Sequence, residues 1–411
     1  MKYVVLLCDG AADCKIQSLG DRTPLEAANK PTMDALVKQS LVGTVSNVPA
    51  GMVPESDTAN LAVLSYNPEI YSKGRSPLEA MSMGLTMTPT QTAIRCNVVT
   101  LGDNGMDDTY EAKTMVDHSA DEITTEEADA LIRTLEEKLG TNERHFYTGI
   151  SYRHCLLWDN APDNGKDFTR PHDIIGKCIR DYLPNEPYHT LMRESYDILS
   201  EHPVNIARME RGLRPANSIW LWSPGKKPQL PSFSEKWGLH ATMISAVDLL
   251  KGIGICAGME VVNVEGATGN LHTNYKGKAD AAIDALKNGK DFVYIHVEAP
   301  DECGHRGESE NKVLSIEYID EKILKPIYTY LSESGEDFKI MVLPDHPTPI
   351  AIRTHSGDPV PFMIYDSRHP QTGTESFNEE EAAKTGLYVA RGENLLSYMI
   401  TPDATPTEEQ A

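Results

Sequence analysis

The sequence lacks any long apolar run. The first apolar stretch, within "KYVVLLCDG" at 2–10, covers about six residues, and no later segment approaches the roughly 18 residues that a membrane-spanning helix needs. Positive charge is also scarce, since 38 Lys and Arg face 61 Asp and Glu, giving a formal net charge of −23. Nucleic acids and anionic membranes are bound by clustered Lys and Arg. We therefore expect neither as a partner.

The seven cysteines include no C-x-x-C pair, and their number is odd. Without a secretory signal, this pattern predicts free thiols and a cytoplasmic protein. Hydrophobic residues make up 40% and charged residues 24% of the 411 residues, which are ordinary values for a globular protein. The length permits one large domain with an insertion, or two domains.

Short apolar runs alternate with helical patterns along most of the chain. The runs lie at 3–8, 218–222, 259–264, 292–297 and 338–343. Between them, 241–253 and 311–331 carry the spacing of helices. Continuous apolar strands separated by helices predict an α/β fold with a mostly parallel sheet flanked by helices.

Residues 90–180 show a different pattern. Segments 91–101 and 150–158 are typical of strands, and an amphipathic helix is predicted between a Thr124/Glu127 capping box and Gly140. We therefore expect a smaller α/β cap domain at 90–180, inserted into a core formed by 1–89 and 181–401. The tail, 402–411, is predicted to be disordered.

Acidic residues and histidines follow several of the predicted strands. Since the carboxyl ends of parallel strands form one edge of a sheet, these side chains are expected to gather there. An isolated Asp after a strand is most often a helix cap, but carboxylates and imidazoles converging as a set suit zinc, manganese or iron. The predicted ligands are Asp9, Asp301, His305, Asp345, His346 and His355.

Ser56 stands in "AGMVPESDTANLAVLSY" at 50–66, where a Gly/Pro-containing loop leads into a predicted helix. Its hydroxyl could simply cap that helix. The helix dipole at this position also favours an alkoxide and an incoming phosphate, and metal coordination would lower the hydroxyl pKa further. Both interpretations remain open from the residues alone.

The motifs taken together resemble a known family. They are Asp9, "PESDTANL" (54–61), "GRSPLEA" (74–80), "RCN" (95–97), "YRH" (152–154), "GATGNLHTNYKGKA" (266–279), "HVEAPDECGH" (296–305), "DHPTP" (345–349) and "THSGDPVPF" (354–362). In this order, over nearly the whole chain, they resemble the archaeal-type branch of the cofactor-independent (2,3-bisphosphoglycerate-independent) phosphoglycerate mutases, within the alkaline phosphatase superfamily.

This resemblance implies an alkaline-phosphatase-like core and an isomerase of glycolysis and gluconeogenesis. The enzyme would interconvert 2- and 3-phosphoglycerate through a phosphoserine at Ser56, without bisphosphoglycerate. Two divalent ions are implied, manganese most often, with zinc, cobalt or magnesium as alternatives. Carried over, Asp301, His305 and His355 would hold one ion, while Asp9, Ser56, Asp345 and His346 would hold the other.

Cations are expected to hold the substrate, a small phosphorylated metabolite, because Arg matches carboxylate and phosphate geometry. The candidates are Arg75, Arg95, Arg153 and Lys278, and the cap is expected to shield the phosphoserine from water. Glu55 departs from the resembling sequences, which often have Gly there, and its charge should repel phosphate. Homoserine or water as phosphate acceptor therefore remains an alternative, as does a non-catalytic metal-binding protein.

Overall fold

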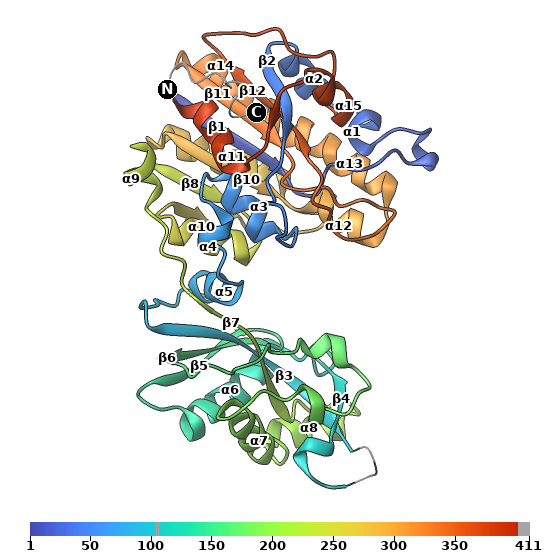
Figure 1. Ribbon diagram of the computed structural model, residues 1–411, viewed down its shortest axis with the longest axis vertical. Helices are drawn as coiled ribbons and strands as arrows, with labels where there is room; N and C mark the ends of the chain where they lie inside the picture. Colours follow the sequence, from blue (N-terminus) through green and yellow to red (C-terminus); the bar gives the residue numbers. More distant parts are fainter. Residues whose placement is uncertain (104, 106, 402–411) are drawn as a thin grey trace. The chain divides into compact units, whose positions relative to one another are not determined.

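The computed structural model describes residues 1–103, 105 and 107–401, and the chain divides into two compact units (Figure 1). The first unit comprises Met1–Ser72 and the chain from Gln229 onward, and the second is Lys73–Pro228. The insertion is thus longer at both ends than the predicted 90–180, and the first unit is correspondingly smaller than 1–89 with 181–401. The predicted disordered tail, 402–411, lies outside the described residues.

The first unit is built on a sheet that has eight strands in the described part of the chain, ordered β13-β2-β12-β11-β1-β10-β8-β9. Neighbouring strands are parallel except where β12 runs antiparallel to both β11 and β2. The mostly parallel α/β sheet predicted from the apolar runs is confirmed. The strands are β1 (Lys2–Cys8), β2 (Ser40–Val45), β8 (Ala241–Ile244), β9 (Glu260–Val262), β10 (Phe292–Val297), β11 (Phe338–Leu343), β12 (Val360–Asp366) and β13 (Tyr388–Val389).

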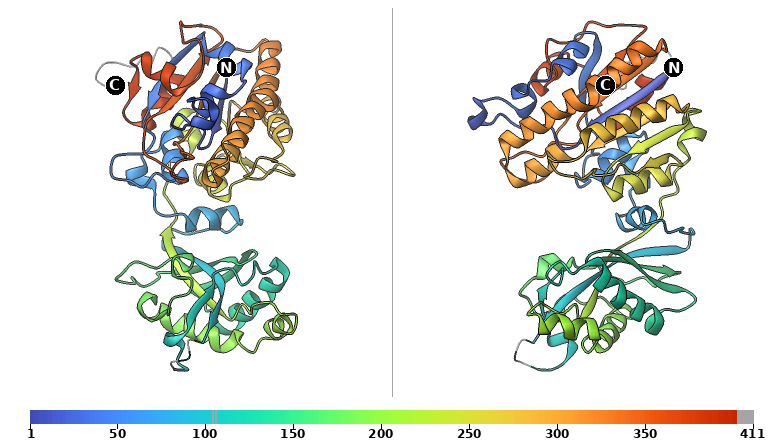
Figure 2. Two further views of the ribbon diagram at one scale, coloured as in Figure 1. Left: turned by 90° about the vertical axis from the view of Figure 1, so that its right-hand side faces the viewer. Right: turned by 180° about the vertical axis from the view of Figure 1, so that it is seen from behind.

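Helices lie on both faces of this sheet (Figure 2). Val4, Leu6, Val293 and Ile295 point into one buried cluster with residues of α2, α11, α13 and α14. Tyr294 points the opposite way, and its hydroxyl donates to Asn60 of α3. The helices of this unit are α1 (Pro24–Ala27), α2 (Pro31–Val37), α3 (Ser56–Val63), α4 (Pro68–Tyr71), α9 (Phe233–Trp237), α10 (Asp248–Cys256), α11 (Tyr275–Lys287), α12 (Ala299–Arg306), α13 (Ser309–Ile319), α14 (Lys325–Ser334), α15 (Glu379–Lys384) and α16 (Leu395–Ile400).

Two helix predictions in this unit had different outcomes. The helix expected at 311–331 is present as α13 and α14, joined by a π-helical turn at Asp320–Leu324. The helix expected at 241–253 was wrong in its first half, because Ala241–Ile244 forms β8 between β10 and β9. A buried strand and a buried helix segment are equally apolar over four residues, so the pattern alone could not separate them.

The second unit has its own antiparallel sheet around the long strand β3. Residues 218–222, predicted to join the main sheet, instead belong to β7, which pairs with β3. An apolar run does not specify which sheet it enters, and this pairing carries the insertion beyond residue 180. The elements are α5 (Ser76–Ser82), β3 (Gln91–Gly102), β4 (Thr114–Asp117), α6 (Thr125–Leu139), β5 (Arg144–Ile150), β6 (Arg153–Asp159), α7 (Tyr188–Leu199), α8 (Pro203–Glu210) and β7, with β7 spanning Ser218–Lys226.

The amphipathic helix predicted in this unit is confirmed as α6, with Thr124 as its N-cap and Gly140 as its C-cap. The Thr124 hydroxyl accepts from the backbone N–H of Glu127. The Glu127 carboxylate does not complete the predicted capping box, because it binds Arg208 and Arg211 instead. The acidic end of the helix is therefore paired within its own unit.

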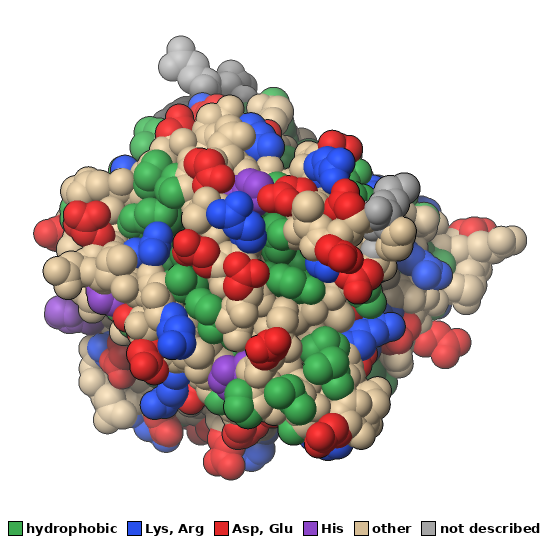
Figure 3. Space-filling view, turned by 90° about the horizontal axis from the view of Figure 1, so that it is seen from below, with side chains coloured by type: hydrophobic (Ala, Val, Ile, Leu, Met, Phe, Trp, Pro, Cys, Tyr) green, Lys and Arg blue, Asp and Glu red, His purple; other side chains and the backbone are tan. Residues whose placement is uncertain are grey.

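Surface and thiol chemistry are unexceptional. Acidic and basic side chains are interspersed over the face that Figure 3 shows. All seven cysteines are free thiols, as predicted. Across the residues that the structure describes, each helix is too short or too polar to cross a lipid bilayer.

Asp117 of the second unit stabilises a tight turn, and this leads to a pH-dependent prediction. Its carboxylate accepts from the backbone N–H groups of Ser119 and Asp121 and from Arg214. Burial raises the pKa of Asp117, but these hydrogen bonds outweigh it and lower the pKa from 3.8 to about 2. The resulting stabilisation is present above the unfolded-state pKa and is lost as the pH falls through about 2.

We therefore expect Asp117→Asn to lower the free energy of unfolding at pH 7 by about 1–2 kcal/mol. The variant should also lose less stability than the wild type between about pH 4 and pH 2, because its side chain no longer titrates. Urea unfolding followed by tryptophan fluorescence would measure both. Parallel curves for the two proteins across that interval would contradict the assignment.

Candidate active site

Three neighbouring strands deliver acidic side chains to one edge of the first unit's sheet. β1 lies between β10 and β11 and is parallel to both, with Leu7 opposite His296 on one side and Leu343 on the other. Their carboxyl ends therefore coincide. Asp9 follows β1, Asp301 lies in α12 just after β10, and Asp345 follows β11. The relative exposure of these three residues is 1%, 6% and 1%.

The first group of side chains comprises Asp301, His305 and His355. Helix α12 places Asp301 and His305 four residues apart on one face, with His305 Nε2 at 3.2 Å from Asp301 Oδ2. His355 Nε2 lies 3.4 Å from Asp301 Oδ1 and 3.0 Å from His305 Nε2. The structure thus brings together the three residues that the resemblance assigns to one metal ion.

Backbone carbonyls orient both imidazoles of this group. His305 Nδ1 lies 3.0 Å from the Arg353 carbonyl oxygen, and His355 Nδ1 lies 2.6 Å from that of Pro54. With Nδ1–H donating to a carbonyl, each ring presents its Nε2 on the side of Asp301, as metal-binding histidines commonly do. The His355 contact also fixes the loop that leads to Ser56.

The second group comprises Asp9, Asp345 and His346, together with Ser56. His346 Nε2 lies 3.7 Å from Asp9 Oδ1, 3.5 Å from Asp345 Oδ2 and 3.3 Å from Ser56 Oγ. The His346 ring stacks on that of His355 with centroids 4.0 Å apart, so the two groups adjoin. His346 also lies near the first group, because possible ligand atoms of His346, Asp301 and His355 are all within 4.8 Å of one another.

Glu298 forms a further acidic group with Asp9 and Asp301, their possible ligand atoms also lying within 4.8 Å of one another. Glu298 is not among the ligands predicted from the sequence. Its carboxylate adds negative charge at the same edge of the sheet.

The charge balance of the site fits bound cations. Asp9 Oδ1 is buried and, among the described residues, has no hydrogen-bond partner. Burial, and then the carboxylates of Asp345 and Asp301, raise the pKa of Asp9 well above its usual range. Buried carboxylates of this kind require a counter-charge. Divalent ions would satisfy both the unpaired oxygen and the excess of negative charge.

The pKa values of His305 and Asp301 also indicate that the site requires positive charge. The hydrogen bond to Asp301 raises the pKa of His305 to about 9. Burial opposes ionisation of Asp301, but hydrogen bonds from His305 and His355 hold the pKa of that carboxyl well below its usual range. A proton shared at His305 thus partly neutralises Asp301. A metal ion that binds these ligands would displace that proton.

Ser56 is the first residue of α3, and its hydroxyl does not cap the helix. Glu55 occupies the N-cap position without a side-chain cap bond. The interpretation of Ser56 as a helix cap was therefore wrong, and its Oγ instead faces His346. The backbone carbonyl of Ser56 accepts from Asn60 Nδ2 at 2.8 Å.

Two residues outside the predicted ligand set hold the acids in place. Asn60 Nδ2 donates to Asp345 Oδ2 at 2.8 Å, and its Oδ1 accepts from the Tyr294 hydroxyl. His296 Nε2 donates to Asp9 Oδ2 at 2.8 Å, and burial lowers the pKa of His296 to about 3, so the ring is neutral. Asn60 could have been found from sequence, because it lies one helical turn after Ser56.

The predicted substrate-binding cations differ in their surroundings. Lys278 is 0% exposed, and its Nζ donates to the His296 carbonyl oxygen at 2.9 Å. Burial lowers the pKa of Lys278 to about 8. Glu298 and Asp9 lie close enough to Lys278 that their negative charges raise its pKa against the effect of burial.

The three arginines lie in the second unit. Arg95 forms an ion pair with Glu79, with its Nε at 2.7 Å from Oε2, and stacks over Trp222 with its Cζ 4.5 Å from the ring centroid. Arg153 is exposed beside Tyr152. Arg75 precedes α5 at its N-cap position. Since β3 and β6 pair Arg95 with Cys155 and Asn97 with Arg153, Arg95 and Arg153 lie diagonally on one face of this sheet.

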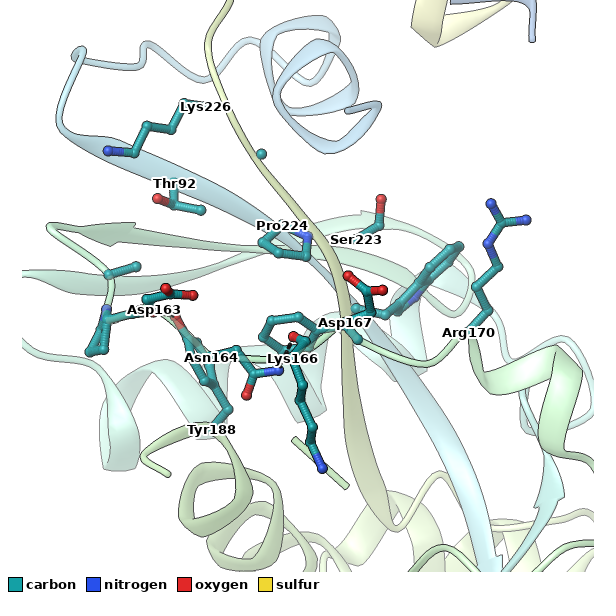
Figure 4. Close-up of a pocket in the computed structure, with 15 residues that line it drawn as sticks. Thr92, Asp163, Asn164, Lys166, Asp167, Arg170, Tyr188, Ser223, Pro224 and Lys226 are labelled. Atoms are coloured by element: carbon teal, nitrogen blue, oxygen red, sulfur yellow. Dashed lines mark hydrogen bonds between the residues drawn. The ribbon is translucent and has the colours of Figure 1, made fainter. Parts of the chain in front are cut away.

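The second unit also contains an open cavity of about 640 Å³ (Figure 4). Charged residues from one loop, among them Asp163, Lys166 and Arg170, line it together with Lys226 of β7. The described residues that form its walls do not include the predicted arginines. Trp222, on which Arg95 stacks, also lines this cavity.

The chain is similar to known proteins over nearly its whole length. Residues 37–205 match a family model described as 2,3-bisphosphoglycerate-independent phosphoglycerate mutase. The enzyme of that name from Methanosarcina acetivorans is 45% identical over 406 residues, covering 97% of this chain and 100% of its own. A probable enzyme of that name from Geobacter sulfurreducens is 44% identical over 405 residues, covering 97% of this chain and 100% of its own.

Two solved structures share the fold. A Pyrococcus horikoshii protein matches with a TM-score of 0.79 and 27% identity, covering 99% of both chains. The cofactor-independent phosphoglycerate mutase from Thermoplasma acidophilum matches with a TM-score of 0.67 and 27% identity, covering 97% of this chain and 99% of its own. Both matches extend over the two units.

Proposed function

Since the chain belongs to the 2,3-bisphosphoglycerate-independent phosphoglycerate mutases, we propose that it interconverts 2- and 3-phosphoglycerate through transient phosphorylation of Ser56. The observation that carries this proposal is the position of Ser56 Oγ, 3.3 Å from His346 Nε2 at the junction of the two ligand groups. A hydroxyl beside these acids and imidazoles can act as a nucleophile rather than as a helix cap.

The ligand sets follow the two groups. Asp301, His305 and His355 would hold one ion, and Asp9, Asp345, His346 and Ser56 the other. Bound there, divalent ions would stabilise negative charge on the phosphoryl oxygens and lower the pKa of the Ser56 hydroxyl. Imidazole with carboxylate suits manganese, which we propose as the native metal, and also zinc or cobalt.

The chain's own residues prepare Ser56 for this reaction. Asn60 holds the Ser56 carbonyl and Asp345 through one amide group, so the nucleophile and a ligand keep a constant relative position. As the first residue of α3, Ser56 lies where the helix dipole stabilises a phosphate. Pro54, bound to His355, restricts the preceding loop.

The proposed reaction needs no second phosphate donor. The phosphoryl group forms a bond to Ser56 Oγ as its bond to one glycerate oxygen breaks, and that oxygen gains a proton in exchange. The other glycerate hydroxyl then takes the phosphoryl group and restores the Ser56 hydroxyl. Arg75, Arg95 and Arg153 are our candidates for binding the substrate carboxylate and phosphate. A glycolytic role would place the enzyme in the cytoplasm.

A direct assay tests this function. Purified protein with Mn²⁺ and 3-phosphoglycerate, without bisphosphoglycerate, should produce 2-phosphoglycerate, detectable by ³¹P NMR. Parallel reactions would contain homoserine with ATP, or 3-phosphoglycerate monitored for free phosphate. Turnover in either parallel reaction, with no 2-phosphoglycerate formed, would reassign the acceptor to homoserine or to water.

A further inference from the structure

A buried lysine outside the ligand set lies where the ligand-bearing loops meet. Lys312 of α13 is 0% exposed. Its Nζ donates to the Thr348 carbonyl oxygen at 2.9 Å, to the Ala12 carbonyl oxygen at 3.3 Å and to Asp13 Oδ2 at 2.8 Å. An ammonium group has three N–H donors, so these three acceptors satisfy it fully.

The carboxylate of Asp13 makes further hydrogen bonds to the segment after β1 and to the segment after β11. Its Oδ2 also accepts from the backbone N–H of Ile350, and its Oδ1 accepts from that of Cys14. The segment after β1, which carries Asp9, is thereby joined to the segment after β11, which carries Asp345 and His346. A backbone hydrogen bond from Thr348 to Ala12 strengthens the same junction.

Thr348 transmits this junction to the third ligand-bearing segment. Its hydroxyl donates to Asp301 Oδ1. Thr348 is tightly packed against α12, because a Cβ added at Gly304 would lie 2.6 Å from the Thr348 carbonyl oxygen. One added at Gly10 would lie 2.5 Å from the Thr348 hydroxyl. A shift of Thr348 would therefore move Asp301.

We propose that Lys312, paired with Asp13, is a positioning residue that sets the metal affinity of the site. It holds the segments after β1 and β11 together and, through Thr348, keeps Asp301 in its ligand orientation. Among the described hydrogen bonds, Lys312 Nζ makes none to a predicted ligand side chain, so its effect passes through the backbone and Thr348. This inference rests on the proposed function only in that those ligands bind divalent ions.

The chain offers a matched control. Lys30 is also buried, at 1% exposure, and its Nζ contacts Asp34 Oδ1 and Ser376 Oγ, each at 3.1 Å. Neither Asp34 nor Ser376 adjoins a predicted metal ligand in the sequence. Lys30→Met and Lys312→Met each remove a buried ammonium from the same unit and leave a carboxylate partner behind. Both should reduce stability.

The two variants should separate in Mn²⁺ binding to the full-length protein, measured from the EPR signal of free Mn²⁺ without substrate. Lys312→Met should raise the dissociation constant roughly 10- to 100-fold, whereas Lys30→Met should change it less than about twofold. In turnover, kcat of Lys312→Met should recover with excess Mn²⁺ and KM for 3-phosphoglycerate should stay unchanged.

Unchanged Mn²⁺ affinity in Lys312→Met, or an equal loss in Lys30→Met, would overturn the inference. If Lys312→Met does not fold, the double variant Lys312→Gln with Asp13→Asn decides the question, because it keeps hydrogen-bonding groups and leaves no unpaired charge. The same increase in dissociation constant is expected there. A wild-type protein that binds Mn²⁺ but forms no 2-phosphoglycerate would refute the proposed function and leave this comparison valid.

Discussion

Ser56→Ala should reduce the interconversion of 2- and 3-phosphoglycerate by about 10⁴-fold or more, because the reaction has no other acceptor for the phosphoryl group. The fold should survive, since Glu55 rather than Ser56 is the N-cap of α3 and the Ser56 hydroxyl contacts only His346 among the described hydrogen bonds. Steady-state rates with saturating Mn²⁺ would measure the loss, and circular dichroism and metal analysis would verify that the protein is intact.

A matched control for this variant is Ser40→Ala. Ser40 is buried in the same unit, and its hydroxyl donates to the Leu36 carbonyl oxygen, away from the ligands. Its removal should affect stability slightly and activity little. If Ser56→Ala retained turnover comparable to that of Ser40→Ala, Ser56 would not be the nucleophile.

His346→Ala should have the second-largest effect, because His346 is the imidazole that both ligand groups share. The variant loses one imidazole that lies beside Asp9, Asp345 and Asp301 and that also contacts the Ser56 hydroxyl. We expect at least about 10³-fold lower kcat/KM, as the loss of several kcal/mol of charge stabilisation would produce. Metal content, measured by elemental analysis after dialysis, should fall as well.

The control for His346→Ala is His369→Ala, since His369 is exposed and follows the end of β12 that pairs with the start of β11, whereas the ligand Asp345 follows the end of β11. It should retain full metal content and activity. A His346→Ala protein with wild-type metal content and turnover would remove His346 from the site and leave the proposed arrangement of Ser56 without its main support.

The site could be predicted because three ligand-bearing segments obey a local rule. Asp9, Asp301 and Asp345 each follow a strongly apolar run, and parallel strands bring such residues to one edge of a sheet. The registers of β1 with β10 and β11 then place them together. Every part of that argument depends on residues adjacent in sequence to a strand.

The residues that hold these ligands were harder to identify. Lys312 contacts the backbone carbonyls of Ala12, 300 residues away, and of Thr348, 36 residues away. Backbone carbonyls carry no sequence signal. Lys278 lies in a glycine-containing motif, and that motif did not indicate that its side chain would be buried. Its side chain direction depends on how α11 packs, which its own sequence does not specify.

The extent of the insertion was also misjudged for a physical reason. The first part of β7, residues 218–222, is as apolar as the strands of the main sheet, yet β7 pairs with β3 in the other sheet. Residues 218–222 alone contain nothing that distinguishes the two sheets. Strand pairing over long sequence separations is set by the whole fold, so the boundary near residue 228 emerged only from the structure.

The central claim, that Ser56 carries the phosphoryl group, is tested most directly by trapping it. The Mn²⁺-loaded enzyme would be quenched in acid during turnover of 3-phosphoglycerate, and the peptide containing Ser56 examined by mass spectrometry. The account predicts one phosphate on Ser56, present only when substrate was added. Continued turnover with Ser56 unmodified, or with the phosphate on another residue, would contradict it.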